Sequence, residues 1–396
     1  MKLVDSKERK NIAVFFGGRS AEHDVSIITA HLPIIKSLLA SNLFDVFPIY
    51  IAKDGSWYSD PKMNELDYFK QDNLDEIFLK QKKLQILFDE GLKIIWPGFI
   101  PKTVKIDVAF PAMHGTYGED GSLMGLLRMA DVPFVGCDIF ASAVAMDKVL
   151  TKQILSVEGV SVVPYVWFMR NDWDKNKQKC LDETSKLKLP LFVKPVHLGS
   201  SIAITKVKKI EDLENAIEVA MHFDDKVLVE EGIENLIEVT LPIMGNTELQ
   251  LAHIERPLNK GDLFDFDAKY IGGGKKSGGV NNEYSEIPAK IEENLAREVK
   301  EMGIKTYKTL GCEGIARVDF LIDNLSKKVY VNEVNTLPGG LYDHNWRKSG
   351  LSDIELVTKL VTLAFDRYTM YKDTVYTFDS KILKQLNGAK FQNKQS

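Results

Sequence analysis

The chain has 396 residues, of which 44% are hydrophobic and 27% charged, so it can bury a substantial core and form two or three domains. Its formal net charge of -5 argues against nucleic acid or an acidic membrane surface as the main partner. Its 3 cysteines are far apart in sequence and form no CxxC pair, which argues against a disulfide framework or a zinc site and is typical of reduced, cytoplasmic thiols.

The first part of the chain alternates strand and helix patterns. Its charged start precedes only a short apolar run, which predicts neither a signal peptide nor a membrane span. Residues 11–18 predict a strand and turn, 20–40 a helix, 44–52 a strand, and 105–115 a strand ending in a loop. This rhythm predicts a parallel sheet in an α/β domain. The lysine-rich stretch 80–93 is interpreted as a solvated segment beside that sheet.

The remainder of the chain favours an α+β layout. Residues 190–207 predict a strand, a glycine turn and a second strand, and a helix then leads to a further strand at 226–233. Beyond residue 237, strands alternate with helices at 289–310 and 352–368. The polar C-terminal tail is expected to fray.

A lysine and a glycine turn suggest a phosphate site in the middle of the chain. Lys194 ends a predicted buried strand, and Gly199, Ser200 and Ser201 form the turn that follows. Backbone N–H groups and hydroxyls in such a turn could cover a polyphosphate that the lysine also reaches. An ordinary hairpin with a solvated lysine is the alternative. The chain has no Walker P-loop motif.

Two predicted strands carry acidic and amide side chains. Alternation places Arg317 and Asp319 on one face of a strand, and Glu333 and Asn335 on one face of the next. Oxygen ligands of this kind suit Mg²⁺. Surface acids at strand ends are the alternative, but these strands are otherwise apolar, and unpaired acids there would be costly.

Two further stretches are typical of functional loops. Glycines punctuate residues 114–121, where His114 is interpreted as loop architecture, and Lys148 on a later helix could supply another phosphate contact. Lys269 and Tyr270 precede a stretch rich in glycine and lysine, which predicts a mobile cationic lid over phosphate. A disordered linker is the alternative.

The glycine turn at 17–18 is followed by acids where a phosphate-binding turn would have none. Glu22 and Asp24 would repel a phosphate near the helix N-terminus. A zwitterion fits better, because N–H groups can take its carboxylate and Glu22 its ammonium group. The turn therefore predicts an amino-acid substrate. Alternatively, Ser20 caps the helix and the acids only favour its dipole, which leaves the double glycine unexplained.

Together these stretches resemble the D-alanine–D-alanine ligase family of the ATP-grasp superfamily. The resemblance covers about residues 12–370. It is carried by motifs in the family's order: GGRSAEHDVS, HGTYGEDGSLMGLL, VPFVG, MDK, VKPVHLGSS, VLVEE, FDFDAKY, RVDF and NEVNTLPG.

The resemblance implies a three-domain ATP-grasp fold that combines α/β and α+β parts. An N-terminal parallel-sheet (preATP-grasp) substrate domain is expected at 1–136, and a central ATP-grasp subdomain at 137–233. A C-terminal subdomain with the magnesium site is expected at 234–378, before a polar tail at 379–396.

The resemblance also implies roles for individual residues. In the catalytic group, Glu22 matches the acid that holds the ammonium group of the first amino acid, and Ser200 and Tyr270 match the side chains that hydrogen-bond with it. Arg317 matches the arginine that faces the reacting phosphate, and Gly339 matches the source of an oxyanion-hole N–H. The ATP-binding group comprises lysines at the phosphates, glutamates at adenine and ribose, and a turn serine: Lys148, Lys194, Lys269, Glu230, Glu238 and Ser201. The expected ligands of Mg²⁺ or Mn²⁺ are Asp319, Glu333 and Asn335.

The activity implied by the resemblance is ATP-dependent ligation of D-alanine to D-alanine through an acyl phosphate, with release of ADP and phosphate. The implied setting is peptidoglycan biosynthesis in the cytoplasm, by a homodimer. Two other classes remain open: a phosphotransferase that stops after phosphorylating its substrate, and a non-catalytic nucleotide-binding relative. The latter has no need to keep the magnesium residues together.

The chain departs from the family pattern after NTLPG. A family serine that meets the second amino acid's carboxylate is missing from the shortened segment 340–349, where Tyr342 and His344 are the candidate acceptor residues. Loop drift is one interpretation, and an acceptor other than D-alanine is another. Ala203, in place of a family glycine, is a further departure.

Overall fold

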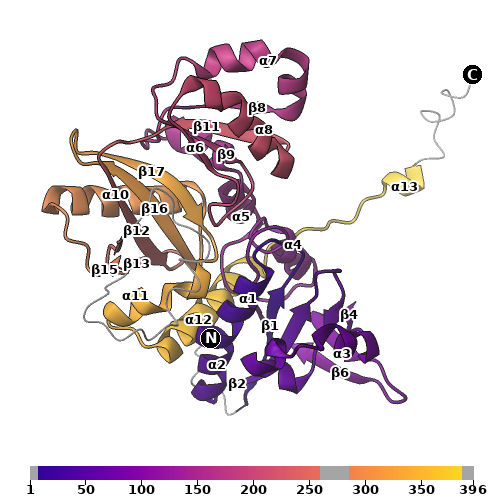
Figure 1. Cartoon of the computed structure of the whole chain (residues 1–396). Helices are drawn as coiled ribbons and strands as arrows, with labels where there is room; N and C mark the ends of the chain where they lie inside the picture. Colours follow the sequence, from indigo (N-terminus) through magenta and orange to yellow (C-terminus); the bar gives the residue numbers. More distant parts are fainter. Residues whose placement is uncertain (1–7, 259–284, 386–396) are drawn as a thin grey trace, which may run out of the picture.

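The computed structural model describes residues 8–258 and 285–385, which form three sheet-centred regions (Figure 1). In the first region, parallel pairing of β1 with β2 and β7 confirms the predicted parallel sheet. The strand order is β3-β2-β1-β7, with bounds Trp57–Tyr58, Phe44–Ile51, Lys10–Gly17 and Val108–Pro111. Side chains of β1 alternate between two apolar clusters, so both faces of the sheet are buried.

Helical segments cover the first sheet. The main one is continuous and comprises α1 (His23–Thr29), a π-helical turn (Ala30–Ile35) and α2 (Lys36–Ser41). Within the described ranges it alone is long and apolar enough to cross a membrane, but 61% of its apolar window is buried inside the protein, as in a core helix. The shorter segments are η3 (Pro61–Asn64), η4 (Leu66–Lys70), α3 (Leu74–Lys80) and α4 (Ser122–Met129).

The lysine-rich stretch 80–93 is largely exposed, as expected for a solvated segment, but it contains strands that the sequence did not indicate. The strand β4 (Gln85–Phe88) and the start of β5 (Leu92–Trp96) fall within it, and they form an antiparallel sheet with β6 (Lys102–Ile106). Leu92 and Ile94 on β5 are buried in a cluster with residues of the parallel sheet. Lysines on the opposite face hid this two-residue alternation in the sequence.

The second region is an antiparallel sheet with helices packed against both of its faces. The strand order is β10-β9-β11-β8, with bounds Thr205–Val207, Leu191–Pro195, Lys226–Glu231 and Tyr165–Met169. The antiparallel β9–β10 pair confirms the predicted strand, turn and strand. The helical segments are α6 (Lys148–Val157), α7 (Arg170–Thr184), η5 (Ile210–Asp212) and α8 (Leu213–Phe223).

The third region contains the strands that carry the predicted magnesium residues. Its order is β13-β12-β16-β17, with bounds Gln250–Leu251, Leu236–Met244, Ile315–Asp323 and Lys328–Asn335. Helices α5 (Ile139–Met146) and α10 (Glu293–Thr309) contribute to its core. A small pair joins β14 (Arg256–Pro257) to β15 (Ser285–Glu286). The chain then forms η6 (Gly339–Tyr342), α11 (Asp343–Lys348), α12 (Asp353–Tyr371) and α13 (Ile382–Gln385).

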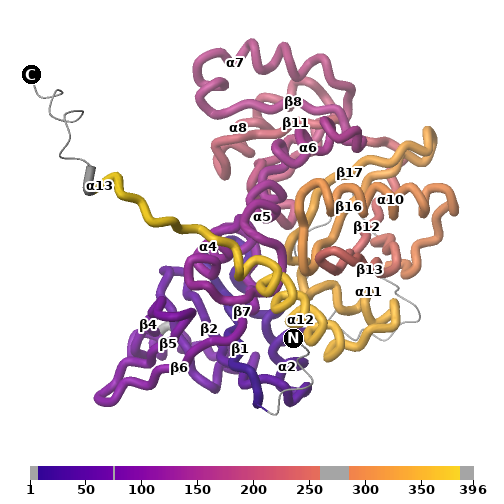
Figure 2. The backbone as a smooth tube through the Cα atoms, turned by 180° about the vertical axis from the view of Figure 1, so that it is seen from behind, coloured from indigo at the N-terminus to yellow at the C-terminus, as the bar shows by residue number. Residues whose placement is uncertain are grey.

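Helix α12 connects the first and third regions, and both views place it beside α2 (Figures 1 and 2). Its Leu356 and Leu360 are fully buried in the cluster that contains β1 and α2 side chains. Arg367 donates hydrogen bonds to the carbonyl oxygens of Phe134 and Gly136, the latter at 2.5 Å. Each main sheet thus lies within one predicted domain range, while the apolar cores extend across the boundaries.

Candidate active site

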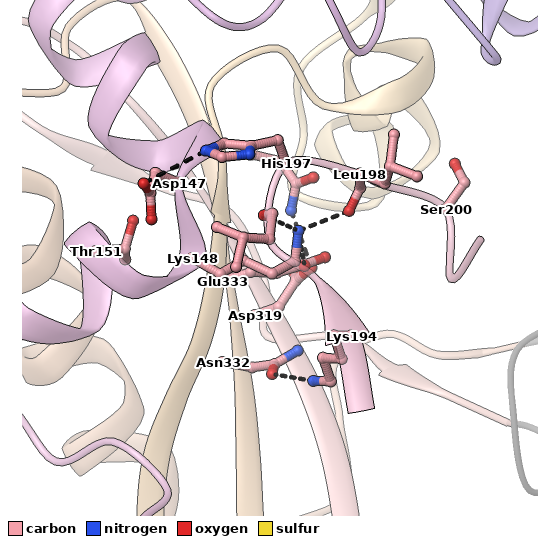
Figure 3. A network of polar contacts seen from close by, with 12 residues as sticks. Asp147, Lys148, Thr151, Lys194, His197, Leu198, Ser200, Asp319, Asn332 and Glu333 are labelled. Atoms are coloured by element: carbon pink, nitrogen blue, oxygen red, sulfur yellow. Dashed lines mark hydrogen bonds and ion pairs between the residues drawn. The ribbon is translucent and has the colours of Figure 1, made fainter. Parts of the chain in front are cut away.

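Lys148 lies where the second and third regions meet (Figure 3). It is the first residue of α6. Asp147 caps this helix, because its carboxylate accepts from the N–H groups of Val149 and Leu150. Lys148 Nζ donates to the carbonyl oxygen of Leu198 at 2.7 Å and lies 4.0 Å from Glu333 Oε2. The predicted phosphate lysine and a predicted metal ligand are therefore neighbours.

The carboxylate of Glu230 is buried between two lysines. It is hydrogen-bonded to Lys194 Nζ and lies 3.0 Å from Lys152 Nζ. Burial alone would raise the pKa of Glu230, but the two ammonium groups outweigh it and hold the pKa at about 2. Sequence reasoning missed Lys152, although its position one helical turn after Lys148 was an available signal.

The β16–β17 hairpin brings together the four predicted residues on these strands. Arg317 lies opposite Asn335, and Asp319 opposite Glu333. Arg317 donates to both carboxylate oxygens of Asp319, at 2.7 and 2.6 Å, and Asn335 Nδ2 lies 3.1 Å from Asp319 Oδ2. Two carboxylates and an amide on facing strands form the oxygen-rich donor set that Mg²⁺ favours, so these residues fit the ion.

Glu22 and Ser200 meet although they are 178 residues apart, because Ser200 Oγ donates to Glu22 Oε1. Glu22 is buried immediately before α1, so Ser20 is not the helix cap; its hydroxyl accepts from the Glu22 N–H instead. Ser200, Ser201 and Ala203 all have left-handed backbone angles, with φ of 54°, 59° and 56°. Such angles cost energy in residues with a side chain, so surrounding contacts must hold this turn.

A protonated acid and a neutral histidine lie near Glu22. Burial, reinforced by the charge of Glu22, raises the pKa of Glu119 to about 8, although Glu119 Oε2 accepts from the Gly115 N–H at 2.8 Å. Burial and the Arg317 charge lower the pKa of His114 to about 4, and its Nε2 lies 2.9 Å from Thr29 Oγ1. Sequence reasoning missed Glu119, since only burial distinguishes it from other loop acids.

The segment after Gly339 packs against Arg317 through Tyr342. Tyr342, with φ of 55°, lies over the Arg317 guanidinium at 4.9 Å, and its hydroxyl accepts from Thr240 Oγ1 at 3.3 Å. His344 Nε2 lies 2.9 Å from Oε2 of the buried Glu255. Tyr342 is thus held by Thr240 on β12, and His344 by Glu255, the residue before β14. Sequence reasoning identified neither contact.

The other predicted residues lie around these groups. Glu238 is two residues before Thr240 on β12, which places both on one face of the strand. Gly339 begins η6, and the N–H of the next residue, Gly340, donates to Thr29 Oγ1 at 3.1 Å. Lys269 and Tyr270 lie outside the described residues.

Comparison with known proteins identifies the family. Models described as D-ala D-ala ligase N-terminus and C-terminus match residues 11–137 and 154–362. A D-alanine–D-alanine ligase of Thermosipho melanesiensis is 36% identical over 94% of this chain and 98% of its own length.

Solved structures agree with this comparison. The D-alanine–D-alanine ligase of Coxiella burnetii matches with a TM-score of 0.75 and 28% identity, covering 96% of this chain and 98% of that one. The VanG D-Ala:D-Ser ligase of Enterococcus faecalis matches at 0.73 and 32%, covering 90% and 100%. The chain therefore belongs to the D-alanine–D-alanine ligase family, and it is an ATP-dependent ligase.

Proposed function

We propose that this chain joins D-alanine to a second D-alanine in an ATP- and Mg²⁺-dependent reaction that serves peptidoglycan biosynthesis. The observation that carries the proposal is a pair of contacts between distant groups. Lys148 lies beside Glu333 on the hairpin that carries Arg317 and Asp319, and Ser200 of the glycine turn meets Glu22 of the N-terminal region. The protein thus combines lysines and carboxylates suited to a nucleotide and its metal ion with a buried carboxylate suited to the ammonium group of an amino acid.

The first amino acid binds at the start of α1 in this proposal. Glu22 accepts from the substrate's ammonium group, because its buried carboxylate is a strong acceptor. Ser200 keeps that carboxylate oriented through its hydrogen bond. Glu119 and His114 add little charge to this site. At pH 7, burial keeps the Glu119 carboxyl protonated and the His114 ring neutral.

Lysines position the nucleotide in the proposed site. Lys148 and Lys194 offer ammonium groups to its phosphates, and the Glu230–Lys152 ion pair keeps the Lys194 head in place. Asp319, Glu333 and Asn335 would hold Mg²⁺, which neutralises phosphate charge when it is bound. Glu238 is assigned to the ribose and Ser201 to the phosphate-covering turn.

Amide formation requires a charge-stabilising group beside the reacting carboxyl. The γ-phosphoryl group of ATP passes to the carboxylate of the first amino acid, which releases ADP and leaves an acyl phosphate. The second amine, arriving deprotonated, attacks that carbonyl carbon, and phosphate leaves as the amide forms. The Arg317 guanidinium and the Gly339 N–H stabilise the oxyanion that develops. Asp319 fixes the Arg317 side chain through two hydrogen bonds and Tyr342 covers its face, so the guanidinium is held in place before reaction. Lys269 is assigned to the phosphates and Tyr270 to the group that includes Glu22 and Ser200; both lie outside the described residues.

The test is phosphate release from ATP with D- and L-amino acids, supplied singly and in pairs, together with product analysis. We expect release and a dipeptide with D-alanine alone, and little of either with L-alanine. Phosphorylation without an amide product would instead indicate a phosphotransferase. Absence of any ATP turnover would contradict the proposal.

A second candidate function is ligation of D-alanine to a different amine. The observation that favours it is the acceptor segment, where Tyr342 and the His344–Glu255 pair occupy the place of the family's carboxylate-binding serine. A dipeptide with another acceptor, formed in preference to D-alanyl-D-alanine, would select this alternative.

We also propose that the ligase acts in the cytoplasm as a homodimer. All three cysteines are free and buried, which suits a reducing compartment. Light scattering coupled to gel filtration tests the dimer, and a monomer at micromolar concentration would contradict it.

A further inference from the structure

His197 connects two elements at the base of the glycine turn (Figure 3). Its backbone N–H donates to Asp224 Oδ2 at 2.7 Å, and its Nδ1 lies 3.0 Å from Asp224 Oδ1. Its Nε2 lies 3.4 Å from Oδ2 of Asp147. Asp147 caps the start of α6 and Asp224 follows the end of α8, so one imidazole bridges two helix termini.

The surroundings of the ring favour its protonated form. Hydrogen bonds to Asp147 and Asp224 raise the pKa of His197 to about 9, so the ring is an imidazolium at neutral pH. Lys226 Nζ shares Asp147 Oδ2 at 2.6 Å, and the nearby Asp225 is exposed. A metal ion would need a ring nitrogen free of protons, whereas here both nitrogens face carboxylates.

The residues on either side of His197 contact Lys148 of the proposed nucleotide site. Lys148 Nζ donates to the carbonyl oxygens of Val196 and Leu198, which flank His197, at 3.3 and 2.7 Å. The left-handed turn that begins two residues after Leu198 carries Ser200 to Glu22. A Lys148 ammonium that turns to a phosphate gives up these carbonyls, while the bridge from His197 to the two carboxylates can persist.

We propose that His197 is a positioning residue for nucleotide binding: as an imidazolium between Asp147 and Asp224, it holds residues 196–203 and the start of α6 in the arrangement that lets Lys148 meet a phosphate. This inference rests on the proposed function, because it requires that Lys148 and the turn bind ATP. It assigns His197 no contact with substrate.

The experiment compares His197→Gln and His197→Arg with the wild type, and His222→Gln, an exposed histidine on α8, is the matched control. The KM for ATP and kcat are measured at saturating amino acids from pH 7 to pH 10, and the dissociation constant of ADP with Mg²⁺ is measured directly. Since deprotonation removes one of the two donors, we expect the wild-type KM for ATP to rise by roughly 10-fold between pH 8 and pH 10.

The variants should differ in a way that a merely structural role would not produce. His197→Gln should raise the ATP KM and the ADP dissociation constant roughly 10-fold at pH 7.5, change kcat less than about 3-fold and lose the pH dependence. His197→Arg, which stays charged, should bind nucleotide well through pH 10. His222→Gln should match the wild type.

The outcomes separate this inference from the proposed function. An unchanged nucleotide affinity in His197→Gln, or a pH dependence that persists in His197→Arg, would overturn the positioning role while ligation stands. If His197→Gln does not fold, the comparison of wild type with His197→Arg decides. A wild type that binds no ADP and consumes no ATP would instead refute the proposed function.

Discussion

The β16–β17 hairpin carries Arg317, and the acceptor segment 340–349 packs against this arginine through Tyr342, but the two regions are built by different means. On the hairpin, extended strands place Arg317, Asp319 and Glu333 by simple alternation and antiparallel register. In the acceptor segment, three successive residues from Gly340 to Tyr342 have φ between 54° and 58°, and long-range contacts hold them.

This difference indicates which half of the reaction can vary. On the hairpin, the Asp319 carboxylate accepts from both Arg317 and Asn335. One substitution there disturbs several groups at once, so the nucleotide chemistry tolerates little change. The acceptor segment depends on a few separate contacts, such as His344 to Glu255, and can be remodelled while Arg317 stays in place. We infer that nucleotide use is constrained in this chain and that acceptor choice is adjustable.

The most severe test of the comparison is Glu333→Gln on the hairpin. It removes a carboxylate facing Asp319 and Lys148, and turnover should fall by at least about 1000-fold because phosphate charge is no longer neutralised. Phosphate release and dipeptide formation measure the loss, while circular dichroism should show retained fold. Glu298→Gln, on the exposed surface of α10, is the matched control, and full activity in Glu333→Gln would refute its assignment.

The buried charges behind the nucleotide site should matter for stability as well. Lys152→Met leaves Glu230 with Lys194 as its remaining ammonium partner, so unfolding free energy should fall by about 3 kcal/mol. Chemical denaturation measures the change, with Lys300→Met on the surface of α10 as control. A double variant with Glu230→Gln should lose less than the two single losses combined, and strict additivity would contradict a direct ion pair.

Glu119 tests whether the amino-acid side of the site depends on a protonated acid. The unfolded carboxyl ionises near pH 4.5, but the folded one has a pKa of about 8, so stability should fall as pH rises from about 4.5 to about 8 and then level off. Glu119→Gln removes this slope and should be more stable than the wild type at pH 8 by on the order of a few kcal/mol, with no gain at pH 4.

Denaturation curves at pH 4, 6 and 8 measure the effect of Glu119→Gln. Glu90→Gln, at an exposed turn between β4 and β5, is the matched control and should retain the wild-type slope. Parallel pH dependence in Glu119→Gln and wild type would show that the Glu119 carboxyl is not protonated in the folded protein.

The smallest effect is expected in the acceptor segment. His344→Ala leaves Glu255 with its Asn345 contact and opens the segment, so the acceptor KM should change about 10-fold while the ATP KM stays the same. Steady-state kinetics with each substrate varied in turn provide the measurement, and exposed Lys348→Ala is the control. An equal change in the ATP KM would contradict the separation of the two regions.

The sequence by itself determined the parts of the site that depend on local periodicity. Alternation in β16 and β17 put Arg317 with Asp319 and Glu333 with Asn335, and the glycine turn after Lys194 was expected from its composition. The ordered motifs also identified the family. These features could be predicted because strand period and turn chemistry act between residues that are close in the chain.

Only the tertiary structure decided how distant segments meet. Glu255 and His344 are 89 residues apart, and the packing of α12 on the N-terminal core has no local sequence signal. The paired lysines around Glu230 and the protonated state of Glu119 likewise depend on burial, which the whole fold sets. Desolvation and long-range contacts are properties of the folded chain, so they could not be predicted from residues that are neighbours in the sequence.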